Sequence, residues 1–404
     1  MSSFLKRALA ALAYRDFRIL WFGAFASTVG TWMQKVAQSW LIFDLTKSSF
    51  FLGLDDFLGQ LPILLFTIVG GVIADRHDRR QLLLSSQYVQ MTTAFTLAAL
   101  VWTGYVRIEL ILLLSCLTGF AQAFGGPAYQ SLIPTLVQKE HLPNAIALNS
   151  IQFNLSRIFG SLLAGAALAT FGTAVCFGLN GLSFIVVILA LLALSVKHIK
   201  PAEAHKPMLQ EMSGGFRYMR SEPTLTALTV LACLTTFLGL PLLTFLPVFA
   251  RDVFHGDIGL YSRMMAFSGA GSVVGGLIVA WLGRFKHMGL TLLVMGVVFG
   301  VVLVGFSMSR VLWVSELLLF LAGGSIMMLT AMTTSLVQLI VPDHLRGRIV
   351  SIYMVAFRGG MPLGSLASGY AASLSSVPIV LAVNGTLVSL VAIYFLTRSR
   401  LREL

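Results

Sequence analysis

The stretch Gly70-Gly71-Val72-Ile73-Ala74-Asp75-Arg76-His77-Asp78-Arg79-Arg80 ends one long apolar run shortly before the next begins at Leu82. Two acids, a histidine and three arginines in so few positions predict a tight, charged hairpin between two membrane-spanning helices. Glycine lets a helix end approach a neighbour closely, and a carboxylate such as Asp75 can cap a helix N-terminus or pair with an arginine. A short cytoplasmic loop also collects arginine under the positive-inside rule, but that rule explains neither the glycine pair nor the acids.

Composition predicts the class of protein independently of the hairpin. The 404 residues are 57% hydrophobic and only 11% charged, and the mean hydropathy is +0.87. A soluble domain of this length would expose a large apolar surface, so the chain is predicted to be an all-α integral membrane protein. Because each span needs about 20 apolar residues, we predict twelve helices, at 17-45, 50-74, 81-103, 108-134, 142-170, 173-196, 223-252, 258-283, 288-309, 312-340, 345-373 and 377-397.

The net charge of +12 could indicate a nucleic-acid partner, so the distribution of the charge must decide. If both termini are cytoplasmic, most lysines and arginines fall in the inner segments. The outer segments then hold only Lys47, Arg107, Arg251, Arg263 and Arg310. This asymmetry follows the positive-inside rule and indicates a multi-pass topology with an even number of spans. The predicted surroundings are the lipid bilayer, and no nucleic acid is expected as a partner.

The chain is predicted to consist of two six-helix halves, at 1-196 and 223-404, joined by a polar cytoplasmic linker at 197-222. Gly275-Gly276 in the second half matches Gly70-Gly71 in the first, as expected of a weak parallel repeat in a six-plus-six transporter. The predicted protein is a monomer.

Polar side chains inside the spans are the candidates for a substrate cavity, because a polar stripe in a spanning helix cannot face lipid. In the helix at 17-45 such residues recur every three or four positions, so they share one face. The alternative for small and polar residues is close helix packing, and for each arginine it is a bond to a neighbouring helix through carbonyl oxygens. The residues predicted to line the cavity are Thr31, Gln34, Gln38, Gln122, Asn154, Arg157 and Arg358.

Three further charges within the spans lead to a hypothesis of proton coupling. Asp55 and Asp56 are adjacent carboxylates, which cannot both ionise readily where solvation is poor. Lys35 falls in the same outer half of the membrane and is predicted to be their switching partner. The alternative is that the two aspartates cap their helix near the interface and are solvated.

No motif in the chain supports an enzyme. A glycine-rich phosphate loop with its Lys-Ser/Thr is absent from the sequence, so ATP is not expected to drive the protein. Cys116, Cys176 and Cys233 are isolated within spans and lack metal-ligand spacing, so they are read as packing residues. We expect no cofactor and no metal.

The hairpin also carries a family resemblance. The string G-x-x-x-D-R-x-D-R-R resembles the loop 2-3 signature of major facilitator superfamily transporters, and the positions that match are Gly71, Asp75, Arg76, Asp78, Arg79 and Arg80. In that family the signature forms a conformational latch between helices 2 and 11. With an acid at position 78, the motif resembles that of the branch that includes enterobactin exporters and macrolide efflux pumps. The segment Gly160 to Gly165 resembles the family's helix 5 antiporter signature, with Ser161 in place of its proline.

The resemblance implies a secondary active transporter in a bacterial-type cytoplasmic (inner) membrane. The expected activity is proton-coupled export of a small amphipathic molecule, of the siderophore or macrolide-like class. The main alternative is a metabolite importer or facilitator of the same fold, which these residues do not separate from an exporter. A non-transporting scaffold or receptor is a second alternative, but a scaffold would gain nothing from charges kept within the bilayer.

Overall fold

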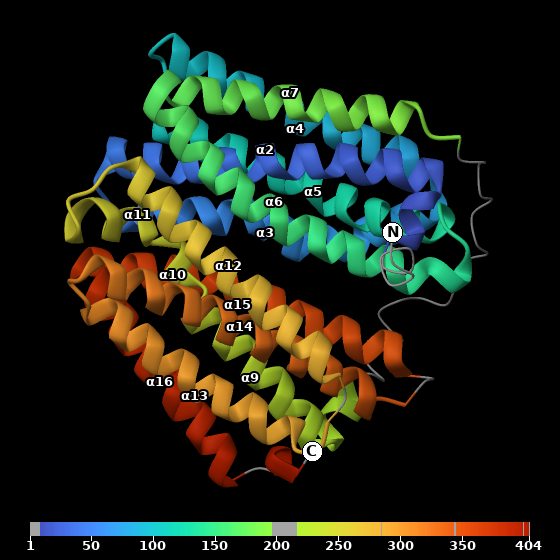
Figure 1. Cartoon of the computed structure of the whole chain (residues 1–404), viewed down its shortest axis with the longest axis vertical. Helices are drawn as coiled ribbons and strands as arrows, with labels where there is room; N and C mark the ends of the chain where they lie inside the picture. The colour runs from blue at the N-terminus through green and yellow to red at the C-terminus, as the bar shows by residue number, and fades with distance from the viewer. Residues whose placement is uncertain (1–8, 196–215, 284, 343–344, 399, 404) are drawn as a thin grey trace. The chain divides into compact units, whose positions relative to one another are not determined.

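The computed structural model describes residues 9–195, 216–283, 285–342, 345–398 and 400–403, and within these ranges the chain is helical with no strand (Figure 1). Long apolar runs favour this outcome because a helix satisfies its backbone hydrogen bonds internally. The long helices are α2 (Arg15–Thr46), α3 (Ser49–Arg76), α4 (Arg79–Trp102), α5 (Ile108–Leu132), α6 (Leu142–Phe171), α7 (Thr173–Leu192), α12 (Ile258–Leu282), α13 (Met288–Met308), α14 (Leu312–Ile340), α15 (Arg346–Leu374) and α16 (Val377–Arg398).

A further span runs from Pro223 to Val253, so the long helical segments in the described part of the chain fit the predicted set of twelve. Nine helices in the described residues are long and apolar enough to cross a membrane by length and composition. The three long helices outside that group are α2, α4 and α6. Two of these, α2 and α6, carry five of the seven residues predicted to line the cavity. The largest error in a predicted boundary is at the end of α7, which stops at Leu192 rather than at residue 196.

The span Pro223–Val253 is not the single helix that the sequence predicts. It divides into α9 (Pro223–Gly239), α10 (Pro241–Thr244), α11 (Leu246–Val248) and a π-helical turn, η4 (Phe249–Val253). Pro241 and Pro247 stand at the starts of α10 and α11, because proline has no N–H to continue the preceding helix. The irregular backbone is buried by neighbouring side chains, as such backbone must be within a membrane.

The chain forms two compact units. Unit 1 is Met1–Thr46, Leu58–Glu203 and Ile258–Ala266, and unit 2 is Lys47–Phe57, Ala204–Asp257 and Phe267–Leu404. In unit 1, α2 packs against α6 and α7, and α4 packs against α5 and α7; in unit 2, α13 packs against α14 and α16, and α9 packs against α15. The linker predicted at 197-222 falls largely outside the described residues, and the division into halves stays a prediction.

Glycines bring the paired helices into backbone contact in the same way in each unit. In unit 1 a side chain on Gly70 of α3 would collide with the backbone of Ala123 of α5. In unit 2 a side chain on Gly275 of α12 would collide with the backbone of Gly324 of α14. The predicted match between Gly70-Gly71 and Gly275-Gly276 therefore has a structural counterpart, which is a close helix crossing that only a small residue permits.

Candidate functional site

The charged hairpin predicted between two spans is present as a short turn from α3 to α4. Asp78 is the N-cap of α4, and its side chain accepts hydrogen bonds from the backbone N–H groups of Arg80 at 2.8 Å and Gln81 at 3.3 Å. A carboxylate in this position satisfies N–H groups that have no partner within the helix. The acidic residue at position 78 therefore has a local role in starting α4.

Two of the three arginines in the hairpin reach the C-terminal ends of other helices in unit 1. Arg79 Nη1 donates to the carbonyl of Ser131 at 3.0 Å, and Arg80 Nη2 donates to the carbonyl of Leu192 at 2.7 Å. A cation is favourable at a helix C-terminus, where carbonyl groups lack partners. The hairpin thus fastens α4 to α5 and α7. The side chains of Asp75 and Arg76 lie outside the described residues, so the latch stays a prediction.

Of the two glycines in the hairpin motif, only Gly70 lies in close helix contact. An added Cβ on Gly71 would meet nothing within 4 Å, whereas one on Gly70 would meet the backbone of Ala123 and lie 3.2 Å from the Cα of Phe124. Gly71, the glycine that matches the family signature, is therefore not required for packing within its unit.

We expect Gly70→Ala to lower the thermal stability of the purified protein and Gly71→Ala to leave it unchanged or raised. Overpacking at Gly70 costs about 1–3 kcal/mol, which exceeds the gain of about 1 kcal/mol from replacing glycine within a helix. At Gly71 an added methyl group meets no neighbouring atom, so only the stabilising effect of replacing glycine applies. Thermal unfolding in detergent measures both, and equal transition temperatures for the two variants would contradict the assigned packing.

Two of the residues predicted to bind substrate or couple protons lie against one aromatic ring. Trp32 on α2 has Arg157 Cζ at 5.9 Å and Lys35 Nζ at 6.0 Å from its ring centroid. Phe153 packs edge-on to the same ring with the centroids 5.9 Å apart. Gly160 of α6 makes the approach possible, because an added Cβ there would collide with Trp32 and with the backbone of Val29. We call Trp32, Lys35, Phe153 and Arg157 the Trp32 cluster.

The other residues predicted to line a cavity are more dispersed. Gln34 accepts from Asn180 of α7 at 2.7 Å, and Gln38 donates to Ser115 of α5 at 2.8 Å, so both side chains join α2 to neighbouring helices. The remaining four lie apart from these bonds: Thr31 and Asn154 donate to carbonyls of their own helices, Gln122 is exposed on α5, and Arg358 is exposed on α15 in unit 2.

The two adjacent aspartates differ in burial. Asp56 is 8% exposed, and its Oδ2 accepts a hydrogen bond from Ser365 of α15 at 2.8 Å. The hydroxyl of Ser365 is in turn 3.1 Å from that of Thr244. Asp55 is half-buried. The alternative that the pair caps its helix is wrong, because α3 begins at Ser49 and its first turn contains no acidic residue.

Neither Trp32 nor Ser365 was among the residues predicted from the sequence. Trp32 stands within the polar stripe of its helix, beside Thr31 and three residues before Lys35, and that position was the available signal. Ser365 directly follows the glycine- and proline-rich run 359–364. Lys35 lies in unit 1 and the aspartates in unit 2, and their pairing stays a prediction.

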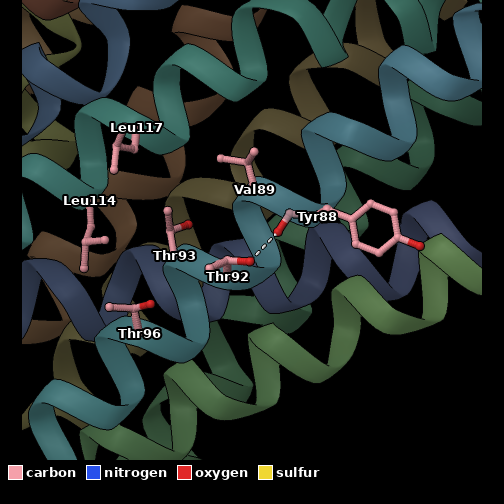
Figure 2. Close-up of a pocket in the computed structure, with 7 residues that line it drawn as sticks. All are labelled: Tyr88, Val89, Thr92, Thr93, Thr96, Leu114 and Leu117. Atoms are coloured by element: carbon pink, nitrogen blue, oxygen red, sulfur yellow. Dashed lines mark hydrogen bonds between the residues drawn. The ribbon is translucent and has the colours of Figure 1, made fainter.

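A separate groove lies on the surface of α4 and α5 (Figure 2). The hydroxyl of Thr92 donates to the carbonyl of Tyr88 at 2.9 Å, the bond drawn in Figure 2, and the Thr93 hydroxyl lies 3.0 Å from that of Thr118. The groove contains no predicted site residue, and its side chains are Tyr88, Val89, Thr92, Thr93, Thr96, Leu114 and Leu117. It is thus distinct from the Trp32 cluster.

A family model described as transmembrane secretion effector matches residues 6–404. The chain belongs to this family. Together with the relatives described next, this match confirms the predicted branch of the major facilitator superfamily, and the protein is a multi-pass membrane transporter.

Three relatives cover nearly the same length as the transporter. It is 26% identical to the Staphyloferrin A transporter of Staphylococcus aureus, over 93% of this chain and 94% of the relative. It is 21% identical to Macrolide efflux protein A of Streptococcus pyogenes, over 96% of this chain and 97% of the relative. It is 25% identical to the enterobactin exporter EntS of Citrobacter koseri, over 87% of this chain and 84% of the relative.

Solved structures support the fold. The crystal structure of the nucleoside transporter NupG superposes with a TM-score of 0.75 at 15% sequence identity, covering 95% of this chain and 98% of that one. At this identity the likeness concerns the fold alone, and it confirms the predicted transporter fold.

Proposed function

We propose that the transporter is a proton-coupled exporter of a small amphipathic molecule of the siderophore or drug-like class. The observation that carries the proposal is the Trp32 cluster, in which Lys35 and Arg157 lie beside an aromatic ring within membrane-spanning helices. Charges in such positions are unfavourable unless they serve a substrate or ion pathway. The names of the relatives, which include an enterobactin exporter and a macrolide efflux protein, support export and the two substrate classes.

The proposed coupling site is the acid pair, with Asp56 as the residue that binds the proton and Lys35 as its predicted partner. Burial and the hydrogen bond from Ser365 support Asp56 over the half-buried Asp55. Substrate would cross without covalent change, so the proposal assigns the chain no catalytic step. The distribution of lysine and arginine supports an inner-membrane protein with both termini in the cytoplasm, and the transporter is proposed to act as a monomer.

Uptake into membrane vesicles of opposite orientation tests this function. Everted and right-side-out vesicles from cells producing the transporter would be energised with lactate and supplied with labelled erythromycin or enterobactin. We expect accumulation of at least one probe in everted vesicles, compared with vesicles lacking the protein, and loss of that accumulation when a protonophore is added.

Each alternative gives a different result in the same assay. An importer would accumulate its substrate in right-side-out vesicles, and a facilitator would bring the probe only to equal concentrations. Uptake indistinguishable from vesicles lacking the protein, in both orientations and for both probes, would contradict the proposal and favour a scaffold.

A further inference from the structure

One edge of the Arg157 guanidinium group is buried without a hydrogen-bond partner. Its Nε and Nη2 atoms are both buried and have no hydrogen-bond partner. These two nitrogens lie on the same side of the planar group, so their N–H bonds point in nearly parallel directions. The alternative in which Arg157 pins a neighbouring helix through carbonyl oxygens is therefore wrong for this edge.

Two parallel N–H donors match the two oxygens of a carboxylate. Such a bidentate pair is stronger than a bond between neutral groups, and it is specific in direction. A buried donor that stays unpaired is costly, by about 1–3 kcal/mol for each group and more for a charged one. The edge therefore favours a ligand that brings two acceptor oxygens together.

The surroundings of this edge indicate what the rest of the ligand is like. The centroid of the Trp32 ring lies 5.9 Å from Arg157 Cζ, and Phe153 packs against the same ring. Ser161 follows Arg157 by one helical turn and shares its face of α6, and its Oγ is also buried without a partner. An aromatic ring therefore lies beside the guanidinium group, and a single buried hydroxyl lies one turn away.

We propose that the Arg157 edge is a carboxylate-binding subsite of the transporter. It would select substrates in which a carboxylate adjoins an apolar or aromatic body that packs on Trp32 and Phe153. The inference rests on the proposed function, since it names the substrate class of the same cluster.

Binding of 1-naphthoate and 1-naphthamide to the full chain in lipid nanodiscs tests the subsite, because the two probes differ only in the charged group. We expect the wild-type transporter to bind naphthoate about tenfold more tightly or better, as a charge-assisted bidentate pair requires. Arg157→Lys keeps the charge but lacks the two-donor edge, so it should lose most of this preference. Arg157→Gln should lose all of it, and the matched variant Arg107→Gln, at an exposed arginine outside the predicted cavity, should retain it.

The proposal is overturned if wild-type protein binds the two probes equally or binds neither, a comparison that requires no variant to fold. An unchanged preference in Arg157→Lys, in protein that elutes as a single species, would overturn it as well. Uptake of erythromycin or enterobactin in vesicles separates the two proposals. Transport without a naphthoate preference removes only the subsite, and a preference without transport removes only the proposed function.

Discussion

Asp56→Asn is expected to abolish accumulation of substrate against its concentration gradient, while movement down the gradient remains measurable. Asparagine has nearly the shape of aspartate, and its amide oxygen can still accept the hydrogen bond from Ser365. It cannot bind and release a proton at any relevant pH. The variant should therefore fold and carry substrate but lose the coupling to the proton gradient.

Proteoliposomes with an imposed pH gradient measure this loss. Asp55→Asn is the matched control, because the neighbouring carboxylate is half-buried rather than buried, and we expect it to retain most of the accumulation. If the double variant Asp55→Asn with Asp56→Asn still accumulates substrate to the wild-type level, the coupling site lies elsewhere in the chain.

Trp32→Ala is expected to weaken substrate affinity by about tenfold or more, the range found for aromatic residues at the centre of a binding site. The substitution removes the ring that lies against Arg157, Lys35 and Phe153. Trp32→Phe keeps part of the aromatic surface and should fall between wild type and Trp32→Ala.

Concentration-dependent uptake in everted vesicles gives the affinity of each variant. Trp313→Ala is the control, because Trp313 lies on α14 and is 69% exposed, and its affinity should match that of wild type. Wild-type affinity in Trp32→Ala, at equal amounts of protein in the membrane, would show that the Trp32 cluster does not bind the substrate.

Nine of the described helices were predictable because their length and apolarity suit a bilayer span. The more polar α2, α4 and α6 were predicted from apolar runs that fall outside this group. All twelve spans lie within four residues of their predicted ends. The span Pro223–Val253 has the predicted ends but not the predicted structure, because it was predicted as one helix and is broken into shorter pieces. Pro241 and Pro247 were visible in the sequence, but apolarity alone does not reveal that surrounding helices bury the broken backbone.

The details of the candidate site depend on how helices pack, which composition does not reveal. Asp55 and Asp56 are the same residue type at adjacent positions, yet their side chains point about 100° apart around the helix. Asp56 is the more buried of the two and accepts the hydrogen bond from Ser365. Gly70 and Gly71 differ for the same reason. Trp32 becomes part of the site because α6 approaches α2 at Gly160, a contact between segments far apart in the chain.

Simultaneous recording of substrate and proton movement in proteoliposomes tests the central claim, that the transporter exchanges protons for an exported molecule. Purified protein would be placed in vesicles with a pH gradient and no nucleotide, with the probe that everted vesicles accumulate. The account predicts substrate accumulation on the acidic side, accompanied by proton flow in the opposite direction that needs substrate and is absent in Asp56→Asn. Substrate that only equilibrates, with proton flow unchanged by its addition, would contradict the account.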